Sequence, residues 1–356
     1  MGQLNIYNIG TGHHRGETNN LLVLLHRDCP ARDATGIASS KGGTWKIIND
    51  GAGSTDEGSS IGAKLKSIGG NAQGTGGSRG VMNATDAMLD LYEATKPDQV
   101  NIVGHSRGAI TSVRVATKLF ERAPNTPVNL FLVDPVKRMA QGTDFHNREI
   151  HPNVYRMMVV VMEDVGDKGL FKVMSLKQRG AGDKKRTHLP TDKFIRMPGS
   201  HGTATQVDGP IGQVTYQIAR RFLRDCGAPV GPDIWSDRRV CNEYFKVQLM
   251  NPLVARNPKK PNDKVRVVND NGKMVDVAKH SRRDRLDGLG IKNRMHGHAV
   301  FVNEHHYALF EGIYPHLAVA LDNGYELDDP RVAVQVTALQ SDCPRGYELL
   351  EKLNLV

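Results

Sequence analysis

A serine between two glycines is the feature of this sequence with the clearest chemistry. A short, largely apolar run at 99–103 leads into Gly104-His105-Ser106-Arg107-Gly108, and small or apolar residues then recur at helical spacing as far as Phe120. Strand, sharp turn and helix in this order are typical of a nucleophile elbow, in which a strained turn exposes the serine hydroxyl. Ser106 is therefore predicted to be a nucleophile. The alternative is a strand-to-helix turn whose serine only caps the helix.

Acyl transfer by a serine also requires a base and a carboxylate that orients the base. In sheets that carry an elbow, these groups follow in the order Ser, Asp or Glu, His. Asp134 ends a buried apolar run, next to a proline that fixes the following turn, and His201 lies in a Gly-rich loop just after a predicted strand. We predict Asp134 as the orienting acid and His201 as the base. Asp164, or Glu163 beside it, is the alternative acid at the end of a later strand.

Backbone amides near Ser106 are the candidate oxyanion donors. Arg107 begins the helix after the elbow, so its amide has no partner within the helix and lies at the positive end of the helix dipole. A Gly-rich loop that contains Gly10 and Thr11 follows the first predicted strand, 4–8. We expect this loop to pack beside the elbow and to supply the second donor.

Strands alternate with helices over the first two thirds of the chain, which predicts an α/β fold with a mostly parallel sheet flanked by helices. The expected strands lie at 4–8, 45–48, 99–103, 127–133, 154–162 and 193–197. From Pro229 the pattern changes to a hairpin about Asn271-Gly272 within a helical and irregular region. We therefore expect a core at 1–227 and a mixed C-terminal lobe or lid at 228–356.

Composition excludes several classes of protein. The chain has 356 residues, a formal charge of +9 and no apolar run of the roughly 20 residues that span a bilayer. Its N-terminus lacks the features of a signal peptide, so we expect synthesis and folding in the cytoplasm. The four cysteines are widely spread, which favours reduced thiols over a zinc site.

Two basic runs, 168–196 and 256–294, lack interleaved aromatic residues. Nucleic acid is therefore not an expected partner, and the runs are interpreted as solvated loops or as a contact with an anionic membrane surface. The glycines of the first loop lack the GxGxxG pattern, and those of 68–80 lack the lysine of a phosphate-binding loop. No cofactor is expected.

One further stretch is rich in metal-ligating residue types. It contains His296, His298, Glu304, His305 and His306. The HExxH spacing of a zinc-binding helix is absent, so the sequence predicts no metal site there.

These motifs resemble the α/β-hydrolase superfamily, and within it the bacterial lipase-like family that includes phospholipase effectors of type VI secretion. Gly104-His105-Ser106-Arg107-Gly108-Ala109 stands where that family typically has Gly-Phe-Ser-Arg-Gly-Ala, and Asp134-Pro135-Val136 resembles the acid context of pancreatic-type lipases. Tyr7-Asn8-Ile9-Gly10-Thr11-Gly12 is similar to the family's Phe-Asp-Gly-Thr-Gly, with Asn8 in place of the usual Asp. The resemblance covers residues 1–226.

The resemblance implies a serine hydrolase that cleaves carboxyl esters of lipids, as a lipase or phospholipase. For an effector of that kind it also implies peripheral contact with an anionic membrane, a cognate immunity or secretion partner, and secretion without a signal peptide. A function other than catalysis stays open, in which the protein has the hydrolase fold, is catalytically silent and acts as a binding protein. The two differ in whether nucleophile, acid and base are all functional.

Overall fold

The computed structural model describes residues 2–35, 42–51, 78–138, 149–163, 171–174, 176–179, 186–188, 193–249, 266–268, 274–276, 286, 289, 291, 300–323 and 329–356. The chain forms two compact units. Unit 1 comprises Met1–Val161, Asp167–Phe194 and Ile218–Pro232, and unit 2 comprises Met162–Gly166, Ile195–Gln217 and Asp233–Val356. The sequence places a single boundary at residue 227, whereas in the structure two segments before that residue group with the C-terminal part.

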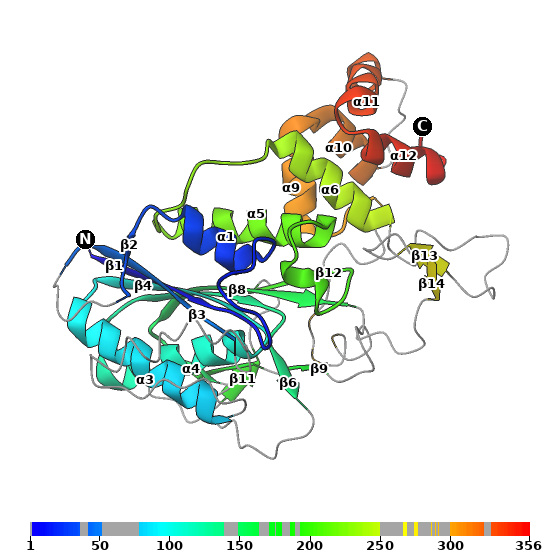
Figure 1. The fold of residues 1–356 in the computed structure, drawn as a ribbon. Helices are drawn as coiled ribbons and strands as arrows, with labels where there is room; N and C mark the ends of the chain where they lie inside the picture. Colours follow the sequence, from blue (N-terminus) through cyan, green and yellow to red (C-terminus); the bar gives the residue numbers. More distant parts are fainter. Residues whose placement is uncertain are drawn as a thin grey trace. The chain divides into compact units, whose positions relative to one another are not determined.

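A seven-stranded sheet has the strand order β12-β8-β5-β4-β1-β3-β2 (Figure 1). Its strands are β1 (Gln3–Asn8), β2 (Arg32–Asp33), β3 (Thr44–Asn49), β4 (Gln99–His105), β5 (Val128–Val133), β8 (Val154–Met162) and β12 (Phe194–Met197). The neighbouring pairs from β2 through β8 are parallel. Every residue of β5 is buried, as expected for a strand covered on both faces. The predicted α/β fold with a mostly parallel sheet is confirmed.

Helices cover both faces of this sheet. Figure 1 shows α1 (Leu21–Asp28) on one face and α3 (Ser78–Thr95) and α4 (Arg107–Arg122) on the other. The apolar residues of α4 recur every three or four positions, and Ala109, Val113, Ala116 and Leu119 are all buried. α5 (Pro210–Asp225) is followed two residues later by Gly227, which has a φ of 71°. Glycine is favoured there, because a residue without a Cβ adopts this conformation readily.

A row of buried asparagines crosses three neighbouring strands of unit 1. Asn101 of β4 pairs in register with Asn5 of β1 and with Asn129 of β5. Asn101 Nδ2 donates to Asn5 Oδ1 at 2.9 Å, and Asn129 Nδ2 donates to Asn101 Oδ1 at 2.8 Å. These two bonds satisfy buried amide groups that would be costly without a partner. This asparagine row fixes the register of the three strands, since a one-residue slip would break every bond in it.

Several short strands lie outside the seven-stranded sheet. They are β6 (Val136–Arg138), β7 (Glu149–Ile150), β9 (Phe171–Val173), β10 (Lys177–Arg179) and β11 (Arg186–His188). The last three fall in the segment for which the sequence predicts a basic loop, so that prediction is wrong for these residues. β13 (Arg266–Val268) and β14 (Met274–Asp276) form an antiparallel pair, which confirms the two arms of the predicted hairpin.

Helices make up much of the described part of unit 2. They are α6 (Asp237–Leu249), α9 (Glu304–Ile313), α10 (Pro315–Asn323), α11 (Pro330–Asp342) and α12 (Pro344–Lys352), beside the short 3-10 helix at Thr203–Thr205. α6 packs against α9 and α12, and α10 packs against α9 and α11. Among the described residues, no helix is both long enough and apolar enough to cross a bilayer.

Candidate active site

Ser106 lies in a strained turn between β4 and α4. Its backbone has φ 58° and ψ −122°, a conformation that residues other than glycine rarely adopt. The Ser106 amide donates to the carbonyl of Val133 at 3.0 Å. The hydroxyl makes no capping hydrogen bond to α4, so the helix-cap alternative does not describe this serine. The backbone geometry is that of a nucleophile elbow.

The two glycines of the turn are required by the close approach of other atoms. A Cβ at Gly104 would lie 2.3 Å from Ser112 Oγ and 2.7 Å from Ala109 Cα. A Cβ at Gly108 would lie 2.1 Å from the carbonyl oxygen of Asn8. Glycine at these positions therefore lets β1, β4 and α4 approach closely enough to form the turn.

Asn8 stands where the resembling family has an Asp, and it has a structural role at the end of β1. Its Nδ2 donates to Ser112 Oγ at 2.9 Å, and its Oδ1 accepts from Asn49 Nδ2 at 2.6 Å. The side chain is buried, so both its donor and its acceptor need partners. An ionised Asp would lack the donor to Ser112.

Asp134 lies at the same end of the sheet as Ser106, one strand away. β4 and β5 are parallel and His105 pairs with Val133, so the residues that follow them, Ser106 and Asp134, are neighbours in register. Asp134 is fully buried, has a φ of 41°, and its amide donates to the carbonyl of Val160 at 2.7 Å. The carboxyl ends of parallel strands are where such sheets hold their sites.

The loop after β1 packs against the elbow, as the sequence predicts. A Cβ at Gly10 would lie 2.5 Å from His105 Nδ1 and 3.1 Å from Ser106 Cβ. Thr11 Oγ1 accepts a hydrogen bond from Nε of Arg107, the first residue of α4. Within the described part of the chain, the amides of Gly10 and Thr11 donate to no backbone carbonyl. Gly10 and Thr11 thus adjoin Ser106 and Arg107.

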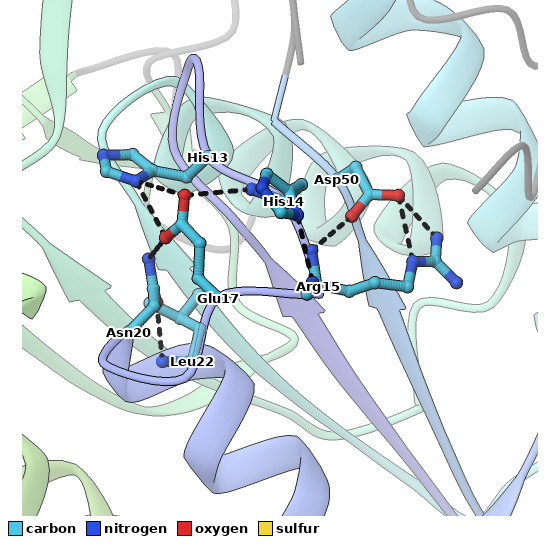
Figure 2. A network of polar contacts seen from close by, with 8 residues as sticks. His13, His14, Arg15, Glu17, Asn20, Leu22 and Asp50 are labelled. Carbon is cyan, nitrogen blue, oxygen red and sulfur yellow. Dashed lines mark hydrogen bonds and ion pairs between the residues drawn. The ribbon is translucent and has the colours of Figure 1, made fainter. Parts of the chain in front are cut away.

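A network of charged and polar side chains holds this loop (Figure 2). Its members are His13, His14, Arg15, Glu17, Asn20 and Asp50, together with the backbone of Leu22. Sequence reasoning recognised the Gly-rich loop but assigned no role to His13 or Glu17. The sequence contains one signal for their contact, which is that Glu17 follows His13 by four residues. This spacing brings side chains together in a helix but predicts no contact in a loop.

His201 belongs to unit 2, whereas Ser106 and Asp134 belong to unit 1. It follows β12 in a turn that begins after Gly199, whose φ is 114°. The amide of Ser200 donates to Thr203 Oγ1 at 3.1 Å, and the Thr203 amide donates to the carbonyl of Ser200 at 3.2 Å. These two bonds close the turn around His201, which is buried.

The alternative acid, Asp164, lies outside the described residues. Glu163 beside it forms a buried ion pair with Arg196, with 2.9 Å between Oε1 and Nε. Arg196 Nη1 also donates to the carbonyl of Ile291 at 3.0 Å. Glu163 thus neutralises the buried charge of Arg196, which would be left uncompensated without it.

The histidine-rich stretch divides into residues with and without a described structure. His296 and His298 lie outside the described residues, whereas His305 and His306 lie in α9. Burial holds the pKa of His306 well below its usual range, and its ring stacks on Tyr244 at 4.6 Å between centroids. His305 Nδ1 lies 2.7 Å from Tyr244 Oη. Among the described residues, no group of three or more His, Cys, Asp or Glu could hold a metal ion.

Comparisons with known proteins add little to this geometry. No family model matches the chain, and no curated protein matches it. A solved structure described as "the putative cell surface hydrolase from Lactobacillus plantarum WCFS1" is similar at 11% identity and a TM-score of 0.35, over 63% of this chain and 92% of that one. That likeness is too distant to carry an argument about activity, so the case for function rests on the elbow itself.

Proposed function

We propose that this protein is a serine hydrolase of carboxyl esters, with Ser106 as the nucleophile. The observation that carries the proposal is the strained backbone of Ser106, at φ 58° and ψ −122°, between two glycines that tolerate no Cβ. Strain of this kind costs on the order of 1–3 kcal/mol, and it persists where the fold over-determines it, commonly at functional sites. A turn whose serine only capped the helix would have no need of it.

In the proposed reaction, Ser106 Oγ attacks the ester carbonyl while His201 takes its proton. Asp134 orients the imidazole and stabilises its charged form. The amides of Arg107 and of Gly10 or Thr11 bind the oxyanion. The assignment of Asp134 is supported by its position in register with Ser106, and that of His201 by chain order, because the histidine follows the acid in sheets with this elbow.

We further propose that the substrates are esters of lipids, with a phospholipase of the type VI effector kind as the most specific form. Support comes from the resemblance of the elbow, of the Asp134-Pro135 pair and of the first loop to that family. The net charge of +9 would also favour approach to an anionic membrane surface. An effector of this kind would be made in the cytoplasm and paired with an immunity or secretion partner.

Ester turnover by matched variants tests the proposal. Purified wild-type protein should hydrolyse a short-chain p-nitrophenyl ester, and Ser106→Ala should abolish this without loss of solubility. His201→Ala should lose a similar factor, and the double variant no more, because triad members act as a unit. Asp134→Asn should cost on the order of 10⁴ in kcat, whereas Asp164→Asn should leave the enzyme active.

Each failure of this series has a distinct meaning. Turnover by Ser106→Ala at the wild-type rate would end the assignment of the nucleophile. Full activity of Asp134→Asn together with loss in Asp164→Asn would move the acid to the later strand. Hydrolysis of the soluble ester without any hydrolysis of phosphatidylglycerol vesicles would reject the lipid substrate while the ester hydrolase stands.

A further inference from the structure

The loop between β1 and α1 is anchored to α1 through Glu17 (Figure 2). Both carboxylate oxygens of Glu17 lie 2.9 Å from His13 Nδ1, and Oε2 also accepts from Asn20 Nδ2 at 3.1 Å. Asn20 in turn caps α1, because its Oδ1 accepts from the amide of Leu22 at 3.0 Å. The apolar face of α1 is buried. Glu17 therefore connects His13 to a firmly packed helix.

The same loop is anchored to the end of β3 through a second carboxylate. Asp50 accepts from the Arg15 amide at 2.7 Å, and from Nε and Nη2 of the guanidinium at 3.0 and 2.7 Å. The amide of Gly51 donates to the carbonyl of His13 at 3.0 Å. Both guanidinium nitrogens donate to Oδ2 and the amide donates to Oδ1, so Asp50 holds the side chain and the backbone of Arg15 together. His13 is thus held through its ring by one anchor and through its carbonyl by the other.

His13 also connects these anchors to the elbow. Its amide donates to the carbonyl of Gly10 at 3.2 Å, across a turn in which Gly12 has a φ of 76°. Its ring lies 6.1 Å from that of His105, between centroids. Gly10 itself fits against His105 and Ser106 with no room for a Cβ. Displacement of His13 would therefore shift the backbone that adjoins the nucleophile.

We propose that the His13–Glu17 pair positions the amides of Gly10 and Thr11 at Ser106, which makes His13 and Glu17 positioning residues. This inference rests on the hydrolase function proposed above. An oxyanion donor acts on charge that develops in the transition state, and it must be held within about 0.5 Å of its productive place. Loss of the pair should therefore lower kcat, because the donors move, and leave KM nearly unchanged, because ground-state contacts remain.

Steady-state kinetics of full-length variants on a short-chain p-nitrophenyl ester test the proposal. His13→Phe keeps a ring beside His105 and removes the donor to Glu17, while Glu17→Ala removes the acceptor. Each should lower kcat by on the order of 10²-fold with KM within about twofold. The double variant should lose no more than Glu17→Ala alone, since that variant already lacks the contact with His13. His13→Asn retains an N–H donor near the position of Nδ1 and should restore most of kcat.

The controls separate a positioning role from general damage. His316→Phe makes the same change at an exposed histidine of α10 and should keep wild-type kinetics. Rates are normalised to the folded fraction from circular dichroism at the assay temperature. Wild-type kcat in His13→Phe, or a loss confined to KM, would overturn the proposal while Ser106-dependent hydrolysis stands. Absence of Ser106-dependent hydrolysis in the wild type would instead remove the proposed function and this inference with it.

Discussion

The stability of unit 1 should fall at mildly acidic pH because of one buried histidine. Burial lowers the pKa of His26 from 6.5 to about 4, and the nearby charge of Lys46 acts in the same direction, against an opposing effect of Asp33. Lys46 Nζ donates to the backbone carbonyl of His26 at 2.9 Å, so this cation is held close to the residue. In the unfolded chain, His26 would take up its proton near its ordinary pKa of about 6.5.

The sign and size of the effect follow from this difference in pKa. Between about pH 6.5 and 4 the unfolded state binds more protons than the folded state, so the free energy of unfolding decreases as the pH falls. Each pKa unit is worth about 1.4 kcal/mol, which gives a loss of about 2 kcal/mol at pH 5 and about 3 kcal/mol near pH 4. Above pH 7 both states are neutral at this site and the contribution vanishes.

Urea unfolding of wild type and His26→Gln at a series of pH values measures this contribution. Glutamine does not titrate, so the variant lacks the His26 part of the acid loss but shares every other part, including that of the buried His306. The wild-type free energy of unfolding minus that of the variant should decrease by about 2 kcal/mol between pH 7.5 and 5. His316→Gln, at an exposed site, should leave the pH profile unchanged. A wild-type to His26→Gln difference that stays constant with pH would refute the reasoning.

Two further substitutions test packing that supports the site. Gly108→Ala places a Cβ 2.1 Å from the carbonyl oxygen of Asn8 and should lower the free energy of unfolding in urea by about 1–3 kcal/mol. The control Gly312→Ala, with nothing within 4 Å of its Cβ, should leave the free energy of unfolding unchanged or raise it. Equal effects of the two substitutions would show that the turn tolerates a side chain. Asn101→Ala leaves Asn5 and Asn129 without their partner in the asparagine row and should lower the free energy of unfolding by about 1–3 kcal/mol in the same assay. An unchanged free energy of unfolding would mean that the row contributes nothing to stability.

The elbow could be predicted because its signals are contiguous in the sequence. A strand, a glycine–serine–glycine turn and a helix follow one another within 24 residues, from Gln99 to Arg122. The register of Asp134 with Ser106 also follows from sequence, since consecutive parallel strands commonly pair and each residue comes directly after a strand. Local pattern and strand order are therefore enough to predict the strand–turn–helix around Ser106 and its neighbouring position to Asp134, while the chemical roles of both residues stay predictions.

The remaining features depend on contacts that local pattern does not encode. The pairing of His13 with Glu17 requires the loop to fold back on itself, and the partners of Asn101 come from strands 96 and 28 residues away. β9, β10 and β11 are three residues long each and lie in a segment rich in Lys and Arg, and three residues are too few for an alternating pattern to identify a strand. The grouping of Ile195–Gln217 with the C-terminal helices is likewise set by tertiary packing.

Covalent labelling of Ser106 tests the central claim most directly. Intact wild-type protein treated with a fluorophosphonate should gain one adduct, because only a hydroxyl activated by a neighbouring base reacts readily with such a reagent. Peptide mass spectrometry should place that adduct on Ser106, and Ser106→Ala should gain none. An unlabelled wild-type protein, or an adduct on another serine with Ser106 unmodified, would contradict the assignment of Ser106 as an activated nucleophile.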